Sequence, residues 1–128
     1  MNSTPTIEEA AEAWVAYWRR QLEASESPDD EGSFVVDRLA REEPEVGWSV
    51  ILAILERIDA EPSSRLFQVL AAGPLEDLLS HHGSALVDRV EAEAQRNPRF
   101  NLLLGGVWQN TMTEQVWSRV QACRSEAW

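Results

Sequence analysis

The side chains best suited to acid/base or metal chemistry form one short cluster, made of Glu76, Asp77, His81 and His82. Asp77 and His81 are four residues apart, so on a helix they share a face, as an acid/base or metal-binding pair requires. A small metal-dependent enzyme that uses Glu76, Asp77 and His81 is one hypothesis. The alternative is structural, because acids in a first turn and histidines in a last turn complement the helix dipole. We prefer the structural interpretation and assign no catalytic, metal-binding or cofactor-binding residue, so Asp77 and His81 stay candidates only.

A second candidate site is the segment 105–110, in which two glycines precede Val107, Trp108, Gln109 and Asn110. The glycines predict a hinge that displays one aromatic ring and two amides, which suits a binding loop. No strand precedes them, so the pattern does not favour a nucleotide-binding loop. The preferred interpretation is a turn between helices with Trp108 in the core, and a binding role for Trp108, Gln109 and Asn110 is the alternative.

The six tryptophans divide into an expected core group and two others. Helical periodicity places Trp117 to one side of the apolar stripe of the last helix, near Arg124. Tryptophan and arginine are the residue types that anchor protein interfaces, so we expect Trp117 and Arg124 to contact a partner, unless a wide core stripe buries Trp117. Trp128 is the second tryptophan outside the expected core group, which consists of Trp14, Trp18, Trp48 and Trp108.

Missing residue types exclude several kinds of chemistry. All 11 basic residues are arginine, so the chain has no lysine for a phosphate-binding P-loop, a protein-kinase site or a Schiff base. The single Cys123 cannot form an intrachain disulfide or a cysteine-based structural zinc site. Arg124 beside it can lower a thiol pKa, but nothing in the sequence brings a histidine to the thiol. We therefore expect a thiol without a catalytic role.

The charge of the chain is strongly negative and unevenly spread. The 128 residues contain 22 acids, for a net charge of −11, and residues 1–64 hold 15 acids against five arginines. This argues against direct binding to nucleic acid or to anionic membranes, which requires a basic surface. The N-terminus lacks the pattern of a signal peptide, and the longest strongly apolar run is too short to span a bilayer. We expect a cytoplasmic protein that binds another protein, with a basic partner as one option.

Prolines and capping residues predict the elements that position these side chains. Five of the six prolines, at positions 5, 44, 62, 74 and 98, precede helix-like segments and suit the first helical position. Thr6 with Glu9, and Thr111 with Glu114, form capping boxes, Ser33 is an expected N-cap, and Gly83 suits a left-handed helix end. The expected helices span about residues 7–24, 34–41, 44–59, 62–71, 74–82, 84–96, 98–104 and 112–124.

These elements predict an all-α fold with no strands. Seven to eight short helices with tight turns favour a compact bundle or a short HEAT-like α-solenoid. The length suits one domain over residues 1–128. Within it, residues 1–31 form an acidic N-terminal helix and loop, and residues 44–124 form a helical core. The wide apolar face of the 44–59 helix places that helix at the centre.

Two motifs stand out in the C-terminal part of the chain: GPLEDLL at residues 73–79 with HHG at 81–83, and GGVWQ at residues 105–109. Together they resemble a family of small bacterial proteins that is catalogued as a domain of unknown function. The resemblance covers about residues 44–120. It implies a bacterial, compact, all-helical domain and no particular activity.

The leading hypothesis is a protein-binding module, most concretely an immunity or antitoxin-like protein that masks a basic bacterial toxin. Small size, acidity and spare aromatic residues favour it, as does the absence of a convincing catalytic set. The alternatives are the enzyme with Glu76, Asp77 and His81, and an acidic mimic of nucleic acid. The mimic requires carboxylates at phosphate-like spacing on one surface.

Overall fold

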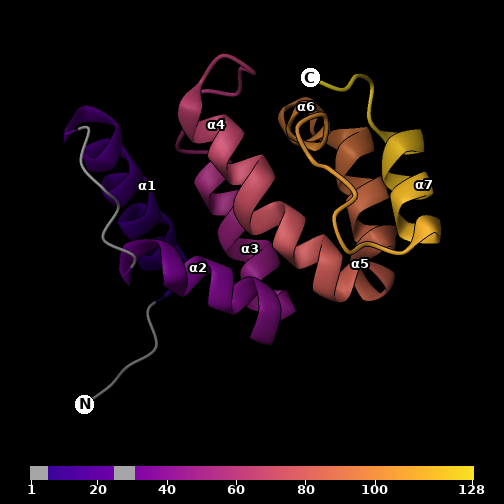
Figure 1. Cartoon of the computed structure of the whole chain (residues 1–128), viewed down its shortest axis with the longest axis horizontal. Helices are drawn as coiled ribbons and strands as arrows, with labels where there is room; N and C mark the ends of the chain where they lie inside the picture. Colours follow the sequence, from indigo (N-terminus) through magenta and orange to yellow (C-terminus); the bar gives the residue numbers. More distant parts are fainter. Residues whose placement is uncertain (1–5, 25–30) are drawn as a thin grey trace.

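The fold is known from a computed structural model that describes residues 6–24 and 31–128 (Figure 1). The side chains of residues 22–24, 31–35 and 37 lie outside the description. The described residues form helices and no strand, which confirms the all-α prediction. The elements are α1 (Ile7–Ala24), α2 (Glu31–Glu42), α3 (Pro44–Leu55), α4 (Arg65–Leu70), the π-helical turn η1 (Ala71–Leu75), α5 (Glu76–Arg96), α6 (Pro98–Leu104) and α7 (Glu114–Cys123).

Helix α3 lies at the centre, as its wide apolar face predicts. It packs against α1 and α2 on one side and approaches α5 and α6 on the other. Val50, Ile51 and Ile54 are fully buried, and Trp48 meets Phe100 of α6 edge to face with ring centroids 5.3 Å apart. Helices α1 and α2 occupy one end of the molecule and α6 and α7 the other (Figure 1).

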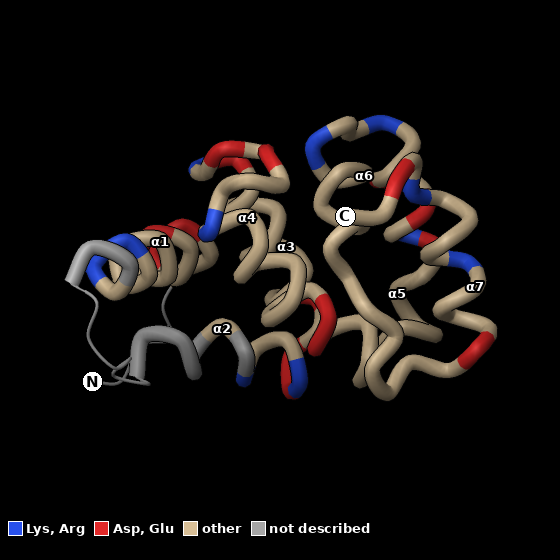
Figure 2. Tube along the Cα trace, turned by 45° about the horizontal axis from the view of Figure 1, so that its top comes forward, with Lys and Arg blue, Asp and Glu red and all other residues tan. Residues whose placement is uncertain are grey.

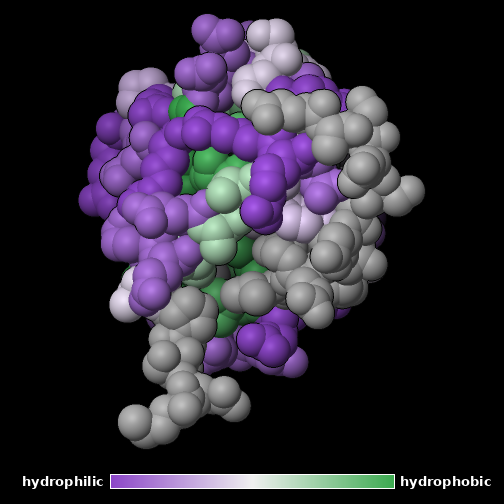
Figure 3. Space-filling view, turned by 90° about the vertical axis from the view of Figure 1, so that its left-hand side faces the viewer, coloured by the Kyte–Doolittle hydropathy of each residue, from purple (hydrophilic) through white to green (hydrophobic). Residues whose placement is uncertain are grey.

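The predicted N-terminal helix has its predicted start and end, 7–24. In the capping box, the Glu9 backbone amide donates to the Thr6 hydroxyl, and the Thr6 amide donates to the Glu9 carboxylate, each at 3.1 Å. Arg57, beyond the end of α3, pairs with Glu8 and donates to the carbonyl oxygen of Ala53 at 2.8 Å. The outer face at this end of the molecule is largely hydrophilic, with a small apolar recess (Figure 3).

Side-chain hydrogen bonds stabilise the junction between α5 and α6. Pro98 occupies the first turn of α6, as predicted, and the Asn97 side chain accepts from the backbone amides of Arg99 and Phe100. The Asn97 amide nitrogen donates to Glu93 at 2.9 Å, and Glu93 also accepts from Arg96. The buried Glu93 carboxylate is therefore satisfied by these donors.

The predicted break at Gly73 is wrong, because α4, η1 and α5 continue as helix through Pro74, whereas the predicted division after residue 82 matches a kink at His82. Proline in an α-helix lacks an N–H group and clashes with the carbonyl four residues back. The wider π turn at η1 accommodates Pro74 instead of ending the helix. The described part of the chain has six helical segments when α5 is counted as one, slightly fewer than the predicted seven to eight, and the kink at His82 divides α5 in two.

Gly83 directly follows this kink but does not adopt the left-handed conformation that the sequence suggested, and it serves helix packing. None of the described glycines has a positive φ, and a Cβ on Gly83 would lie 2.7 Å from Cγ1 of Val116 on α7. The bend of α5 falls one residue earlier, at His82, whose φ is −134° and ψ is 19°. The glycine therefore lets α7 approach α5 closely.

Other predicted boundaries shift by a few residues. Helix α2 begins at Glu31, so Ser33 lies inside it, and α3 ends at Leu55 rather than at residue 59. Ser64 caps α4, so Pro62 does not start a helix, and Thr113 rather than Thr111 caps α7. Pro5 lies outside the described residues. Within the described ranges, no helix combines the length and hydrophobicity needed to cross a membrane.

Arg119 of α7 joins that helix to α5 through two carboxylates. Its Nε atom donates to Glu91 at 3.0 Å, and one Nη atom donates to Asp88 at 2.6 Å. These contacts hold the pKa of Glu91 below its ordinary value of 4.5, and Arg89 lowers the pKa of Glu45 in the same way. A carboxylate with a lowered folded-state pKa stabilises the fold above its ordinary pKa and loses that contribution as pH falls.

We therefore expect the free energy of unfolding to fall as the pH drops below about 4.5. In Arg119→Gln this acid dependence should be weaker, because Glu91 loses the cation that lowers its pKa. Urea unfolding at neutral and acidic pH measures the difference, and Arg65→Gln, at an exposed arginine without a carboxylate partner among the described residues, is the control. An identical acid dependence in wild type and Arg119→Gln would contradict the assignment.

Candidate functional site

The most exposed large hydrophobic side chain in the described structure is Trp108. Its exposed fraction is 70%, whereas Trp14 and Trp48 are buried as predicted and Trp18 is half-buried. The preferred prediction that Trp108 fills the core is therefore wrong. The turn after α6 buries Val107 in its place, and the next residue then faces solvent.

Trp128, which is partly buried, packs against the core where the sequence suggested Trp108. Its backbone amide donates to the Gly105 carbonyl oxygen at 2.9 Å, and its indole Nε1 donates to Leu102 at 2.7 Å. The ring stacks on Phe67 with centroids 5.4 Å apart. A Cβ on Gly106 would lie 2.4 Å from Cη2 of Trp128, so the two glycines of the GGVWQ motif make room for this ring.

Arg124, just beyond α7, is held in place by three contacts. One Nη atom donates to the carbonyl oxygens of Leu104 at 3.3 Å and Val107 at 3.2 Å. The guanidinium carbon lies 5.1 Å from the ring centroid of Trp117, which is a cation–π contact. Arg124 therefore joins the end of α6 to α7 and keeps its charge on the Trp117 ring.

These residues line a surface pocket of about 400 Å³ at the C-terminal end of the molecule. The turn after α6, helix α7 and the C-terminal tail build it, through Val107, Trp108, Trp117, Arg124, Ala127 and Trp128 among others. We call this the tryptophan pocket. Three of the five predicted binding residues, Trp108, Trp117 and Arg124, meet here although they are up to 16 positions apart in sequence.

Gln109 and Asn110 do not line the tryptophan pocket. The Gln109 side-chain amide donates to the Met112 carbonyl oxygen at 3.3 Å, and Asn110 has a positive φ of 48°. A left-handed backbone suits asparagine better than most residues. The two amides thus shape the turn that leads into α7.

The two sequence motifs meet at the rim of this pocket. The backbone amide of Trp108 donates to Glu76 Oε2 at 3.3 Å, so the start of α5 supports the turn that carries Trp108.

The two histidines bond to backbone oxygens. His81 Nδ1 donates to the backbone oxygen of Asp77 at 2.9 Å, and the His82 ring donates to the backbone oxygen of Arg41. Among residues 6–24 and 31–128, no group of three or more histidine, cysteine or acidic side chains is arranged to hold a metal ion.

The family model that matches the chain covers residues 20–128 and is described as a family of unknown function, DUF6869. The chain belongs to that family. The match is wider than the 44–120 segment on which the motif resemblance rested, and it includes the whole tryptophan pocket. No curated protein and no solved structure matches the chain.

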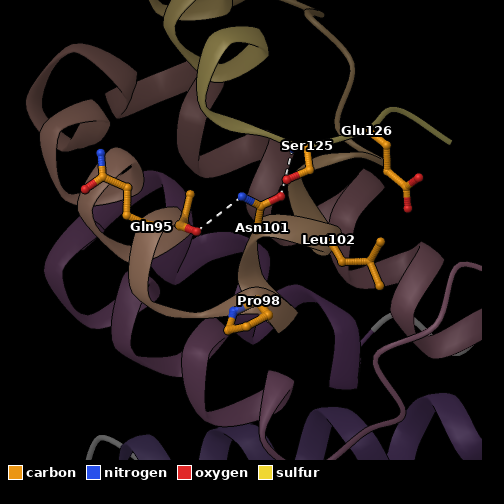
Figure 4. A pocket seen from close by; sticks show the side chains of 7 residues that line it. Gln95, Pro98, Asn101, Leu102, Ser125 and Glu126 are labelled. Atoms are coloured by element: carbon orange, nitrogen blue, oxygen red, sulfur yellow. Dashed lines mark hydrogen bonds between the residues drawn. The ribbon is translucent and has the colours of Figure 1, made fainter.

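A second hollow of about 390 Å³ in this DUF6869 chain lies beside Asn101 and is drawn in Figure 4. The Asn101 amide nitrogen donates to the carbonyl oxygens of Ala94 and Cys123, at 3.2 and 3.1 Å. Its side-chain oxygen accepts from the Ser125 backbone amide at 2.8 Å. All three contacts are internal, so Asn101 fastens the C-terminal tail to α5 and α6.

The thiol of Cys123 is half-buried in this DUF6869 chain and donates weakly to Val120 at 3.4 Å. Burial raises its pKa above 9.0, helped by the negative charge of Glu91, and this outweighs the lowering effect of Arg119 and Arg124. We expect iodoacetamide to alkylate it several-fold more slowly in the folded chain than in denaturant, because only the thiolate reacts. Equal rates at neutral pH in both states would show that the thiol is not protected.

Proposed function

We propose that this DUF6869 member is a protein-binding module whose contact surface is the tryptophan pocket. The observation that carries the proposal is the exposure of Trp108 beside Trp117 and Arg124. Burying the apolar surface of an exposed indole is favourable, so a partner that covers this ring would gain binding free energy. Clusters of tryptophan and arginine are also the usual centres of binding energy at interfaces.

In its narrower form, the proposal makes the partner a basic bacterial toxin and this chain a cytoplasmic, immunity-like or antitoxin-like protein. The acidic N-terminal half supports this. Nine of its acids have described side chains and all nine are exposed: Glu8, Glu9, Glu12, Glu42, Glu43, Glu45, Glu56, Asp59 and Glu61. They lie on α1, around the α2–α3 junction and after α3, with arginines among them (Figure 2). A negative surface of this kind accelerates the approach of a basic protein.

The enzyme and nucleic-acid-mimic hypotheses gain no specific support. Glu76 accepts from the backbone of Trp108, and His81 bonds to a backbone oxygen rather than to the Asp77 carboxylate. These contacts suit helix and turn stabilisation, so neither hypothesis enters the proposal.

The test pairs the full chain with each protein encoded by neighbouring genes. We expect one basic protein to form a stable complex, measured by calorimetry on the purified pair, and to lose its toxicity when the two are co-expressed. In a ¹⁵N spectrum of the complex, the indole signals of Trp108 and Trp117 should shift, whereas those of the buried Trp14 and Trp48 should not. A complex that leaves Trp108 and Trp117 unshifted would refute the assigned surface, and failure of every pair to bind or to relieve toxicity would refute the narrower form.

A further inference from the structure

Arg124 is a cation without a carboxylate partner in the described structure. Three other arginines of the C-terminal half do have carboxylate partners: Arg89 pairs with Glu45, Arg96 with Glu93, and Arg119 with Asp88 and Glu91. One Nη atom of Arg124 donates to two carbonyl oxygens, and its Nε and second Nη atoms form no hydrogen bond to any described residue. Two donors of a guanidinium fork are thus available to an oxygen ligand.

Arg124 is also held in position before any ligand arrives. The two carbonyl oxygens and the Trp117 ring fix its guanidinium, so little side-chain entropy remains to be lost when a ligand binds. Carboxylates match the planar fork of arginine in charge and geometry. The half-buried setting of Arg124 strengthens such a contact relative to open solvent.

The rest of the pocket is apolar and aromatic. Val107, Ala127 and the rings of Trp108, Trp117 and Trp128 contribute its walls. A volume of about 400 Å³ is within the range of small ligand sites and accepts one large side chain with its neighbouring backbone. Aromatic rings favour offset or edge-to-face contacts with one another, so an aromatic side chain suits these walls.

We propose that the tryptophan pocket binds a partner segment in which an aromatic residue is followed by an aspartate or glutamate. The aromatic side chain packs between Trp108, Trp117 and Trp128, and the adjacent carboxylate accepts from the free donors of Arg124. This inference rests on the proposed function and adds the chemistry of the partner segment. It also separates two roles in space, because the acidic helix α1 lies at the opposite end of the molecule from α7 (Figure 1). The acidic residues around α1 would attract a basic partner, and the tryptophan pocket would then bind it through one acidic residue of the partner's own sequence.

The test uses capped tetrapeptides, acetylated and amidated so that only side chains carry charge. One contains Trp-Asp, one contains Trp-Asn, and one contains Ala-Asp, each flanked by glycines. Titration into the ¹⁵N-labelled full chain is followed at the six indole signals. We expect the Trp-Asp peptide to shift the signals of Trp108, Trp117 and Trp128, and to bind about fivefold more tightly than the Trp-Asn peptide. The Ala-Asp peptide should cause no shift.

Variants assign the preference for acid to Arg124. Arg124→Gln should bind both tryptophan peptides equally, whereas Arg65→Gln, which removes the same charge at an exposed site, should keep the fivefold preference. If Arg124→Gln fails to fold, Arg124→Lys and added salt replace it, and both should reduce the preference for Asp over Asn. Equal binding of the Asp and Asn peptides by wild type would overturn this inference and leave the proposed binding surface intact. Absence of any shift at millimolar Trp-Asp peptide would overturn it too, and the co-expression test decides the proposed function separately.

Discussion

Replacing Trp108 by alanine is expected to weaken binding of the protein partner at least about thirtyfold, because it removes the central exposed ring of the pocket. The folded chain should be almost unaffected. Trp108 is 70% exposed, so its substitution should change the free energy of unfolding by no more than about 0.5 kcal/mol. Calorimetry on the complex measures the first effect, and urea unfolding measures the second.

Ile7 offers a matched control for this substitution. It is the other exposed large hydrophobic residue in the described structure, at 37%, and it lies on α1 at the far end from the pocket. Ile7→Ala should leave partner binding unchanged. The assignment of the pocket would be wrong if Trp108→Ala bound as tightly as wild type, or if Ile7→Ala weakened binding equally.

Replacing Gly106 by valine is expected to expel Trp128 from its site. Already a Cβ would lie 2.4 to 2.8 Å from three atoms of the indole ring, and valine adds two further methyl groups. The ring would lose its stacking on Phe67 and its bond to Leu102. We expect the free energy of unfolding to fall by about 2 to 3 kcal/mol. Urea unfolding measures the loss, and a solvent-exposed Trp128 indole signal identifies its cause.

The same substitution should also abolish binding in the pocket, because Trp128 and Ala127 form one of its walls. Gly73→Ala is the control, since a Cβ at Gly73 has no atom within 4 Å outside its own chain neighbours. Its effect should stay within about 1 kcal/mol, because the preference of alanine for helical backbone is opposed by the steric restriction that Pro74 places on the residue before it. A Gly106→Val chain as stable as Gly73→Ala would contradict the role assigned to Trp128.

Local sequence was sufficient wherever a structural feature depends on neighbouring residues. The capping box of Thr6 and Glu9 and the proline starts of α3 and α6 are such features. The box pairs backbone amides within one turn, and a proline at the helix start has no amide that needs a partner. The same locality explains the error at Gly73, where a π turn continues the helix through Pro74. It also explains why the interruption near Gly83 was predicted while the close approach of Val116 to this glycine was not.

The sequence was sufficient to choose the candidate binding residues by their side-chain types, but not to predict that they form one site. Trp108, Trp117 and Arg124 could be chosen because they are aromatic or cationic residues near glycines or beside an apolar stripe. Their common pocket requires α7 to fold back against α5 and the tail to return to α6, and these are long-range contacts that no periodicity encodes.

The sequence by itself determined the helical class, the central position of α3 and the absence of lysine and disulfide chemistry. Only the tertiary structure decided which of the C-terminal tryptophans faces water. The space beside Gly105 and Gly106 is filled by the ring of Trp128. Trp128 occupies it because its backbone amide and its indole both find carbonyl partners at the end of α6. Trp108 is left exposed at the pocket.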